Sequence, residues 1–272
     1  MLPDADDDCR RWPVRDKNSA ANVLRIATVV CLVCAVIVST AAVTLRPFQA
    51  ENRETFRQLN VLKAAGLYME DMDVERAFQR VERRVVDFDS GEYVDPPGGF
   101  DPVRAVRDPA QSNALSGDPA GIGRRTHYGE VFLARSEDGT LESVILPVHA
   151  YGLWSTMYAF LALEADLKTV SGISFFEHGE TPGLGGEIEN PRWQQDWVGK
   201  QVRDPDGDVR FRVDRGATPE GVVDAEHRID GLSGATITSR GVENMVHFWL
   251  GEQGYGPYLA RLETRMQTGE VL

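Results

Sequence analysis

The first long hydrophobic pattern is an uncharged apolar run from Ile26 to Leu45, with an arginine on either side. A helix of these 20 residues would be roughly 30 Å long, about the thickness of a bilayer core. The run is apolar on every side, which disfavours a buried helix of a soluble domain. A signal peptide is the alternative, with Ser39 to Ala42 offering small residues for cleavage, but its apolar region is shorter, about 7–15 residues. We therefore predict one transmembrane helix over residues 23–45.

The next stretch alternates between charged and apolar positions. Residues 46–65 and 74–86 each carry apolar residues at helical spacing, which predicts two amphipathic helices near the membrane. Residues 96–123 open with Pro-Pro-Gly-Gly, which predicts a loop. We assign residues 46–123 to a membrane-proximal, mainly helical region.

Strand patterns begin near Gly129. Residues 130–135 alternate between apolar and polar, 143–148 are rich in β-branched residues, and 168–176 form a further apolar strand. Residues 200–229 predict strands and a polar hairpin with a turn at 204–207. We expect a domain over residues 124–260 with a mainly antiparallel sheet, followed by a C-terminal tail at 261–272.

One apolar helix face lies near the C-terminus, formed by Val242, Met245, Val246, Trp249 and Leu250. Thr238 and Ser239 stand where an N-cap belongs, and Gly251 or Gly254 would end the helix. We expect this helix to pack on the sheet. The predicted fold class is α+β, a single N-terminal transmembrane helix followed by an exported domain.

Composition narrows the function classes. The chain has 272 residues, 42% of them hydrophobic, enough for one sizeable core or two small ones. Its formal net charge of −13 and the lack of a basic stripe exclude nucleic acid as a partner.

Basic residues around the apolar run predict its orientation. Those before the run outnumber those that follow closely, which favours a cytoplasmic N-terminus over residues 1–22 and a periplasmic main domain. The first set is Arg10, Arg11, Arg15, Lys17 and Arg25, and the second is Arg46, Arg53 and Arg57.

All cysteines lie in or before the run, namely Cys9, Cys31 and Cys34. Cys31 and Cys34 have the spacing of a metal or redox pair, but no other ligand type stands beside them, which favours packing. The domain that follows contains no cysteine, so it holds together without a disulfide.

The stretch Asp230-Gly-Leu-Ser-Gly-Ala-Thr236 places hydroxyls and small residues directly before the C-terminal helix. A helix N-terminus offers free N–H groups, so this turn predicts a phosphate site to which Arg240 adds positive charge. An ordinary capped turn is the alternative. A second Gly-Ala-Thr ends at Thr218, but Arg215 replaces the serine before it, and we interpret that copy as a coincidence.

Two other segments have the composition of a site for a flat aromatic ring. Glu177 to Glu187 is crowded with glycine, which allows a ligand to approach the backbone closely. Gly152 to Leu163 is rich in aromatic residues and forms either a wall of this site or core. The alternative for the first segment is a surface turn, and His178 there is not assigned a role.

Together these motifs resemble the C subunit of the Na⁺-translocating NADH:quinone reductase. The resemblance rests on the N-terminal span, Gly152-Leu-Trp-Ser-Thr-Met-Tyr158, Glu180-Thr-Pro-Gly-Leu-Gly185 and Ser233-Gly-Ala-Thr236, and it covers about Val23 to Gly254. Residues 96–123 and 204–226 depart from the family pattern.

The resemblance implies FMN bound covalently through a phosphoester to Thr236. It further implies cofactor contacts from the motif residues Asp230, Ser233, Gly234 and Ala235, and from the ring-site residues Trp154, Glu180, Thr181, Gly183, Leu184 and Gly185. In this interpretation Glu180, Thr181 and backbone amides hydrogen-bond to the flavin ring, while Leu184 packs on its face. No residue is expected to be a catalytic acid or base, because the cofactor carries the redox chemistry.

The family also implies partners and a place in the cell. These are five other subunits, a flavin transferase that takes FMN from FAD, and the bacterial inner membrane, where the complex passes electrons from NADH to ubiquinone and exports sodium. The chain lacks a Gly-x-Gly-x-x-Gly motif for NADH. The alternatives are the G subunit of the ferredoxin-linked electron-transport complex, and an anchored sensor or assembly module that binds FMN reversibly or not at all.

Overall fold

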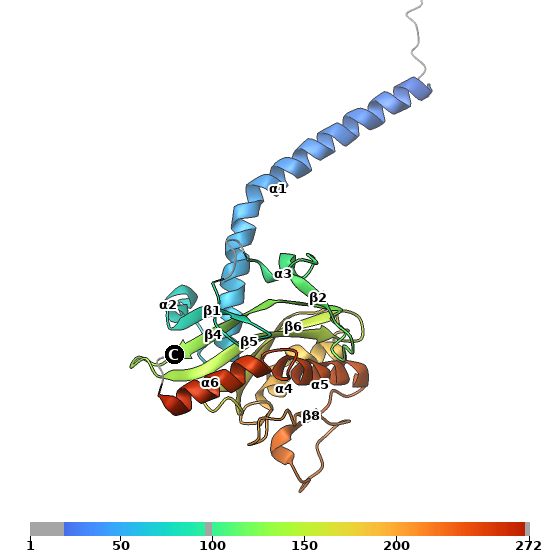
Figure 1. Cartoon of the computed structure of the whole chain (residues 1–272). Coiled ribbons are helices and arrows are strands. Elements are labelled where there is room, and N and C mark those ends of the chain that lie inside the picture. Colours follow the sequence, from blue (N-terminus) through green and yellow to red (C-terminus); the bar gives the residue numbers. More distant parts are fainter. Residues whose placement is uncertain (1–18, 96–99, 270–272) are drawn as a thin grey trace, which may run out of the picture. The chain divides into compact units, whose positions relative to one another are not determined.

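A computed structural model describes residues 19–95 and 100–269 of the chain. The chain divides into two compact units, Met1–Glu54 and Thr55–Leu272. The predictions that fall on residues 1–18 and 96–99 lie outside the described residues. The helices and strands appear in Figure 1, and their order is α1 (Ala20–Ala64), α2 (Val74–Phe78), β1 (Val81–Asp87), α3 (Pro102–Ala105), β2 (Ser112–Ala114), β3 (Arg124–Thr126), β4 (Tyr128–Arg135), β5 (Leu141–Tyr151), β6 (Thr156–Glu164), β7 (Val170–Glu177), η1 (Gly185–Glu189), α4 (Pro191–Gln195), β8 (Arg212–Val213), η2 (Ala225–His227), β9 (Arg228–Ile229), α5 (Thr236–Leu250) and α6 (Gly256–Thr268).

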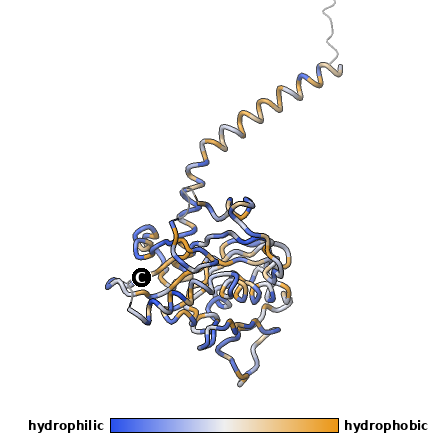
Figure 2. Tube along the Cα trace, viewed as in Figure 1, coloured by the Kyte–Doolittle hydropathy of each residue, from blue (hydrophilic) through white to orange (hydrophobic). Residues whose placement is uncertain are grey.

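Helix α1 contains the predicted transmembrane run and continues beyond it to Ala64 without a break, although Pro47 lies inside it. Among the described residues it is the helix long and apolar enough to cross a membrane, and none of its most apolar stretch is buried. Figure 2 shows the apolar residues spread around this part of the helix. The predicted amphipathic helix at 46–65 is therefore the second half of one element.

The last turn of α1 belongs to the folded domain. Val61, Leu62 and Ala64 are fully buried and form a cluster with residues of one sheet face, such as Phe160. Asn60 accepts a hydrogen bond from Ser174 on β7 at 2.9 Å. Polar and apolar contacts thus fix this turn to the sheet.

A five-stranded antiparallel sheet in the order β1-β4-β5-β6-β7 forms the centre of the domain. Strands β4, β5 and β6 are buried on both faces, so their sequences are nearly continuous apolar runs. The end of α1 covers one face, and α5 and α6 lie along the other (Figure 1). The predicted α+β class with a mainly antiparallel sheet is confirmed.

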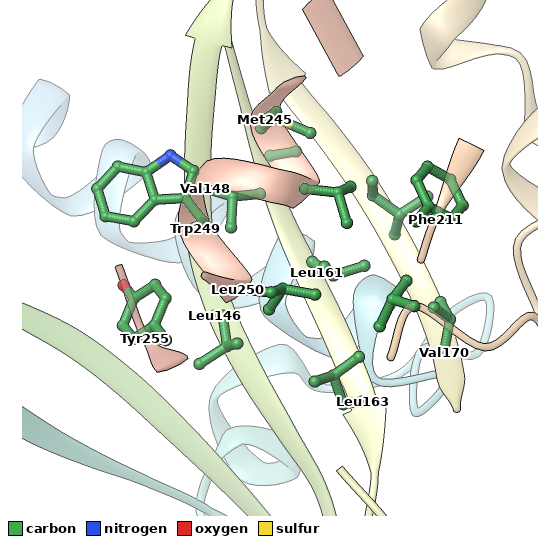
Figure 3. Packing of buried hydrophobic residues seen from close by; sticks show 14 of the residues in the cluster. Leu146, Val148, Leu161, Leu163, Val170, Phe211, Met245, Trp249, Leu250 and Tyr255 are labelled. Carbon is green, nitrogen blue, oxygen red and sulfur yellow. The ribbon is translucent and has the colours of Figure 1, made fainter. Parts of the chain in front are cut away.

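Helix α5 packs its predicted apolar face on the sheet. Val242, Met245 and Val246 are fully buried, and Figure 3 shows Trp249 and Leu250 among strand residues of the same cluster. The helix ends at Leu250 with Gly251 as its C-cap, as one of the two predicted stops requires. Residues 261–268, assigned to a tail from the sequence, belong to α6, which buries Leu262 in the core.

The predicted helix over residues 74–86 is wrong in its second half. Helix α2 ends at Phe78, and β1 begins at Val81 and pairs along its length with β4. Apolar residues four positions apart share a face of a helix and also a face of a strand, so Val81 and Val85 did not distinguish the two. Residues 81–87 form a strand because they pair with β4.

Regular structure is sparse between residues 200 and 229. The turn at Asp204 is present, because its carboxylate accepts hydrogen bonds from the backbone N–H groups of Asp206 and Asp208. The predicted strands reduce to β8 and β9, which pair in parallel over two residues each. Isolated backbone hydrogen bonds, such as Gln201 N–H to Glu226 O at 2.7 Å, and side-chain contacts together hold this segment.

The ring of His149 is half-buried between Tyr158 of β6 and Trp249 of α5. It stacks on Tyr158 with ring centroids 5.3 Å apart and lies 4.8 Å from the ring centroid of Trp249. Burial lowers the pKa of His149 from its ordinary value to about 4, against a smaller upward pull from Asp118. The ring is therefore neutral in the folded domain near neutral pH.

Acidification is expected to destabilise the domain through His149. The unfolded chain takes up a proton below about pH 6.5, whereas the folded ring does so only near pH 4. Stability from this residue is present above pH 6.5 and lost as the pH falls toward 4, by about 3 kcal/mol. Denaturant unfolding of the parent and of His149→Phe at both pH values measures it, and equal losses in the two proteins would contradict it.

Candidate functional site

Helix α5 begins at Thr236 without a side-chain cap. Ala235 occupies the N-cap position and makes no capping hydrogen bond, and Ser239 N–H makes the first helical bond, to Ala235 O at 2.9 Å. The backbone N–H groups of the first turn therefore have no intrahelical acceptor. The side chain of Thr236 is exposed at this end, so a hydroxyl and free N–H donors occupy the same place.

Thr238 and Ser239, predicted as N-caps, lie inside the first turn instead. Both are buried. Ser239 Oγ accepts a hydrogen bond from Leu232 N–H at 3.0 Å, and Thr238 Oγ1 donates to Glu180 Oε2 at 2.5 Å. The hydroxyls that a local pattern assigns to capping are used in tertiary contacts, which leaves the helix N-terminus open.

A pocket of about 420 Å³ opens beside Thr236. It is lined by the start of α5 and by the chain around β8, namely Val213, Asp214, Arg215, Gly216, Leu232, Ser233, Gly234, Thr236, Ser239, Arg240 and Glu243. Thr236 and Arg240 are one helical turn apart and both line it. In the described part of the chain neither Arg215 nor Arg240 forms an ion pair, so both guanidinium groups can meet an anion.

The segment that carries Arg215 is the second Gly-Ala-Thr, whose sequence context alone indicates a coincidence. Asp230 Oδ1 accepts a hydrogen bond from Thr218 N–H at 2.7 Å, and Gly216 O accepts one from Gly231 N–H at 2.8 Å. The 216–218 segment thus lies beside Asp230 and Gly231, the first two residues of the stretch that leads to Thr236. Sequence reasoning missed Arg215, although the repeated tripeptide was a signal that could have found it.

Exposed apolar side chains surround the same helix start. Trp154 is 64% exposed, Leu184 45% and Ile237 56%. A Cβ built on Gly234 would lie 3.1 Å from Leu184 Cδ2, so the loop after β7 touches the motif that precedes Thr236. This apolar wall suits the face of an aromatic ring.

The sequence left open whether the aromatic segment 152–163 forms a wall of the site or part of the core, and its two ends differ in the structure. Residues from Met157 onward belong to β6 and are mostly buried in the core. Trp154 stands in the turn between β5 and β6, closed by a hydrogen bond from Gly152 N–H to Ser155 O at 2.8 Å. Trp154 is exposed, as a wall of the candidate site requires, and most of β6 belongs to the core.

Glu180 lies within the site, but the residue is only 4% exposed. Oε1 accepts hydrogen bonds from the backbone N–H groups of Leu153, Trp154 and Ser155, while Oε2 accepts from Thr238. Both oxygens are thus occupied by protein donors, whereas the sequence motif predicts a hydrogen bond between Glu180 and a flavin ring.

The loop after Glu180 is shaped by its backbone. Thr181 O accepts hydrogen bonds from the N–H groups of Leu184 and Gly186 at 3.1 and 2.9 Å. Gly183 has φ of 75°, a conformation that favours glycine, and Gly185 is buried at the start of η1. The side chains of Thr181 and Leu184 remain exposed at the rim.

The site residues expected from sequence therefore converge. Ser233, Gly234 and Thr236 line the pocket, Trp154 and Leu184 form the wall, and Ala235 precedes the helix. Asp230 and Glu180 hold neighbouring segments in place.

Comparison with known families defines the class of protein. Residues 152–251 match the model of the FMN-binding domain, a range that contains the wall, the loop and the α5 motif. Together with the sheet and the N-terminal apolar helix, this makes the chain an FMN-binding domain protein.

Its relatives specify the family. The chain is 48% identical over 255 residues to the C subunit of the Na(+)-translocating NADH-quinone reductase of Pseudomonas aeruginosa, covering 91% of this chain and 97% of that one. It is 46% identical to the same subunit of Yersinia pestis, over 91% of this chain and 95% of the relative. The crystal structure of Shewanella oneidensis NqrC has a TM-score of 0.72 at 32% identity, over 78% of this chain and 99% of that chain. The chain belongs to the family of the C subunit of the Na⁺-translocating NADH-quinone reductase, an oxidoreductase complex, which confirms the resemblance seen in its motifs.

Proposed function

We propose that this chain is the electron-relay subunit of a Na⁺-translocating NADH:quinone reductase and carries FMN covalently through a phosphoester to Thr236. One observation carries the proposal. The exposed hydroxyl of Thr236 stands at an uncapped helix N-terminus and lines a pocket with Arg215 and Arg240. The names of the relatives favour this assignment over the G subunit of the ferredoxin-linked complex.

The residues present fit a flavin joined at its phosphate. A free phosphate monoester carries about −1.5 to −2 charges near pH 7, whereas a diester to threonine keeps one ionisable oxygen. The first-turn N–H groups of α5, the helix dipole and Arg240 supply the matching positive potential. Without such an anion the helix start lacks a cap, a deficit worth about 1 kcal/mol in other helices.

The apolar wall fits the other end of the cofactor. Trp154 and Leu184 are more exposed than large apolar side chains usually are. Leu184 lies beside Gly234 in the turn that leads to Thr236, and the N–H of Trp154 donates to Glu180, which is bonded to Thr238 of α5. FMN when bound supplies the one- and two-electron redox chemistry. The chain's own residues then position the ring, limit its contact with water and set the local charge.

The relay requires no acid or base from this chain. His178, the obvious proton donor near the site, accepts a hydrogen bond from Glu180 N–H at Nδ1, and its Nε2 lies 3.0 Å from Glu189 Oε1. Because Nδ1 accepts this bond, Nε2 carries a ring proton. Both ring nitrogens face groups of the protein itself, which supports a structural role for His178.

We further propose that residues 23–45 cross the bacterial inner membrane with residues 1–22 in the cytoplasm. Residues 46–123 then lie next to the membrane, and residues 124–260 hold the flavin on the periplasmic side. Five other subunits complete the complex, which passes electrons from NADH to ubiquinone and exports sodium, and a flavin transferase loads the chain from FAD. A single helix cannot enclose an ion pathway, so the sodium route belongs to multi-span partners.

Intact mass spectrometry of the chain purified from its native membrane tests the covalent link. We expect a gain of one FMN less one water, and peptide mapping should place it on Thr236 and not on Thr218. An unmodified chain from cells that contain the transferase would contradict the proposal and favour a reversible FMN-binding module.

A further inference from the structure

A buried carboxylate joins the three segments of the site. The N–H groups of Leu153, Trp154 and Ser155 point at one oxygen of Glu180, at 3.0, 2.9 and 3.4 Å. Consecutive N–H groups that converge in this way form a cradle for an anion. Here the anion comes from the chain itself, and it fixes the turn that carries Trp154.

The other oxygen of Glu180 reaches α5. Thr238 Oγ1 donates to it at 2.5 Å, and Thr238 lies two residues after Thr236 in the first helical turn. Neighbouring glycines leave room for this carboxylate. A Cβ on Gly152 would lie 2.6 Å from Glu180 Oε1, and a Cβ on Gly185 would lie 2.6 Å from Thr238 Oγ1.

Glu180 is held as an anion by dipoles. Burial raises the pKa of Glu180, but the hydrogen bonds from Thr238 and from the backbone of Trp154, Leu153 and Ser155 outweigh it, so its pKa lies below the ordinary value. Within residues 19–95 and 100–269 Glu180 has no cationic side chain at ion-pair distance. Its negative charge therefore remains uncompensated by a neighbouring cation.

We propose that Glu180 is a positioning residue for the flavin site, and this inference rests on the proposed function. Its carboxylate ties the turn bearing Trp154 to the helix start bearing Thr236, so that wall and attachment point stay at a fixed separation. The negative charge of Glu180 also disfavours reduction of a flavin held nearby, and so lowers the midpoint potential of that flavin.

Glu180→Gln tests both parts, because it keeps the size of the side chain and removes the charge. Glu177→Gln is the matched control, an exposed glutamate at the end of β7 with the same change of charge. We expect Glu180→Gln to shift the flavin midpoint potential to a more positive value and to weaken the visible circular dichroism of the flavin, while Glu177→Gln leaves both at the parental values. Intact mass is recorded for each protein to establish how much FMN it carries.

Thr238 provides a second test that keeps the buried charge. Thr238→Val removes the donor to Glu180 Oε2 at nearly the same shape, and Thr238→Ser retains it. The valine variant should lose flavin circular dichroism and the serine variant should recover it. Parental spectra and potentials in Glu180→Gln and Thr238→Val with FMN attached would overturn this inference alone, whereas a parent chain without covalent FMN would overturn the proposed function and this inference with it.

Discussion

Replacement of Thr236 by valine is expected to abolish covalent flavin attachment while leaving the domain folded. The hydroxyl oxygen is the proposed attachment atom, and valine has the same shape without it. The side chain is exposed, and its hydroxyl makes no hydrogen bond within the described part of the chain, so its loss costs the fold little, within about 0.5 kcal/mol. Intact mass and flavin fluorescence in a denaturing gel measure the attachment, and denaturant unfolding measures the fold.

Thr218→Val is the matched control, because Thr218 ends the other Gly-Ala-Thr. This variant should carry the parental amount of FMN. Full attachment in Thr236→Val, or its loss in Thr218→Val alone, would contradict the assignment of the anchor. Loss in both variants would show that attachment at Thr236 also depends on the 216–218 segment.

Gly231→Ala is expected to have the largest effect on stability of any single methyl group added near the site. A Cβ at this position would lie 1.8 Å from the backbone oxygen of Asp214, so the chain around β8 must move away. The move also breaks the hydrogen bond from Gly231 N–H to Gly216 O. Overpacking and the lost hydrogen bond together should cost roughly 3–5 kcal/mol. Because both moving segments line the pocket, FMN attachment should fall as well.

Gly216→Ala separates this clash from backbone strain. Gly216 has φ of 90°, and no heavy atom lies within 4 Å of a Cβ built there. The substitution should therefore cost only the strain of a left-handed residue, about 1–2 kcal/mol. Denaturant midpoints of the two variants measure the difference, and equal destabilisation would show that the close approach of residues 214 and 231 does not constrain the domain.

Much of the fold was predictable because its signals are local. The apolar face of α5 and the strands β4, β5 and β7 follow from spacing along the chain, and the transmembrane run follows from its length, whereas β6 was not predicted as a strand. The same local logic failed at Thr238 and Ser239, since a hydroxyl before an apolar helix face is a good cap only when no tertiary partner competes for it. Glu180 and Leu232 were those partners.

The sequence predicted the residues of the candidate site but not how they are arranged. Motif resemblance named Thr236, Trp154 and Glu180, but the bonds from Glu180 to residues 153–155 join positions far apart in the sequence and depend on the fold. Residues 200–229 were harder still, because isolated backbone bonds and side-chain contacts, such as Arg228 to Asp214 at 2.8 Å, hold this segment where a ladder was expected. Contacts of this kind produce no periodic pattern of apolar residues in the sequence.

The chain contains two Gly-Ala-Thr segments, and their different exposure bears on the proposed modification. Thr218 Oγ1 is buried, whereas Thr236 is exposed at the mouth of the pocket. The tripeptide alone does not distinguish the two hydroxyls, but the folded surface does. An enzyme that modifies the folded chain would reach only the hydroxyl of Thr236. An enzyme that acted on the unfolded chain would meet the hydroxyls of both threonines.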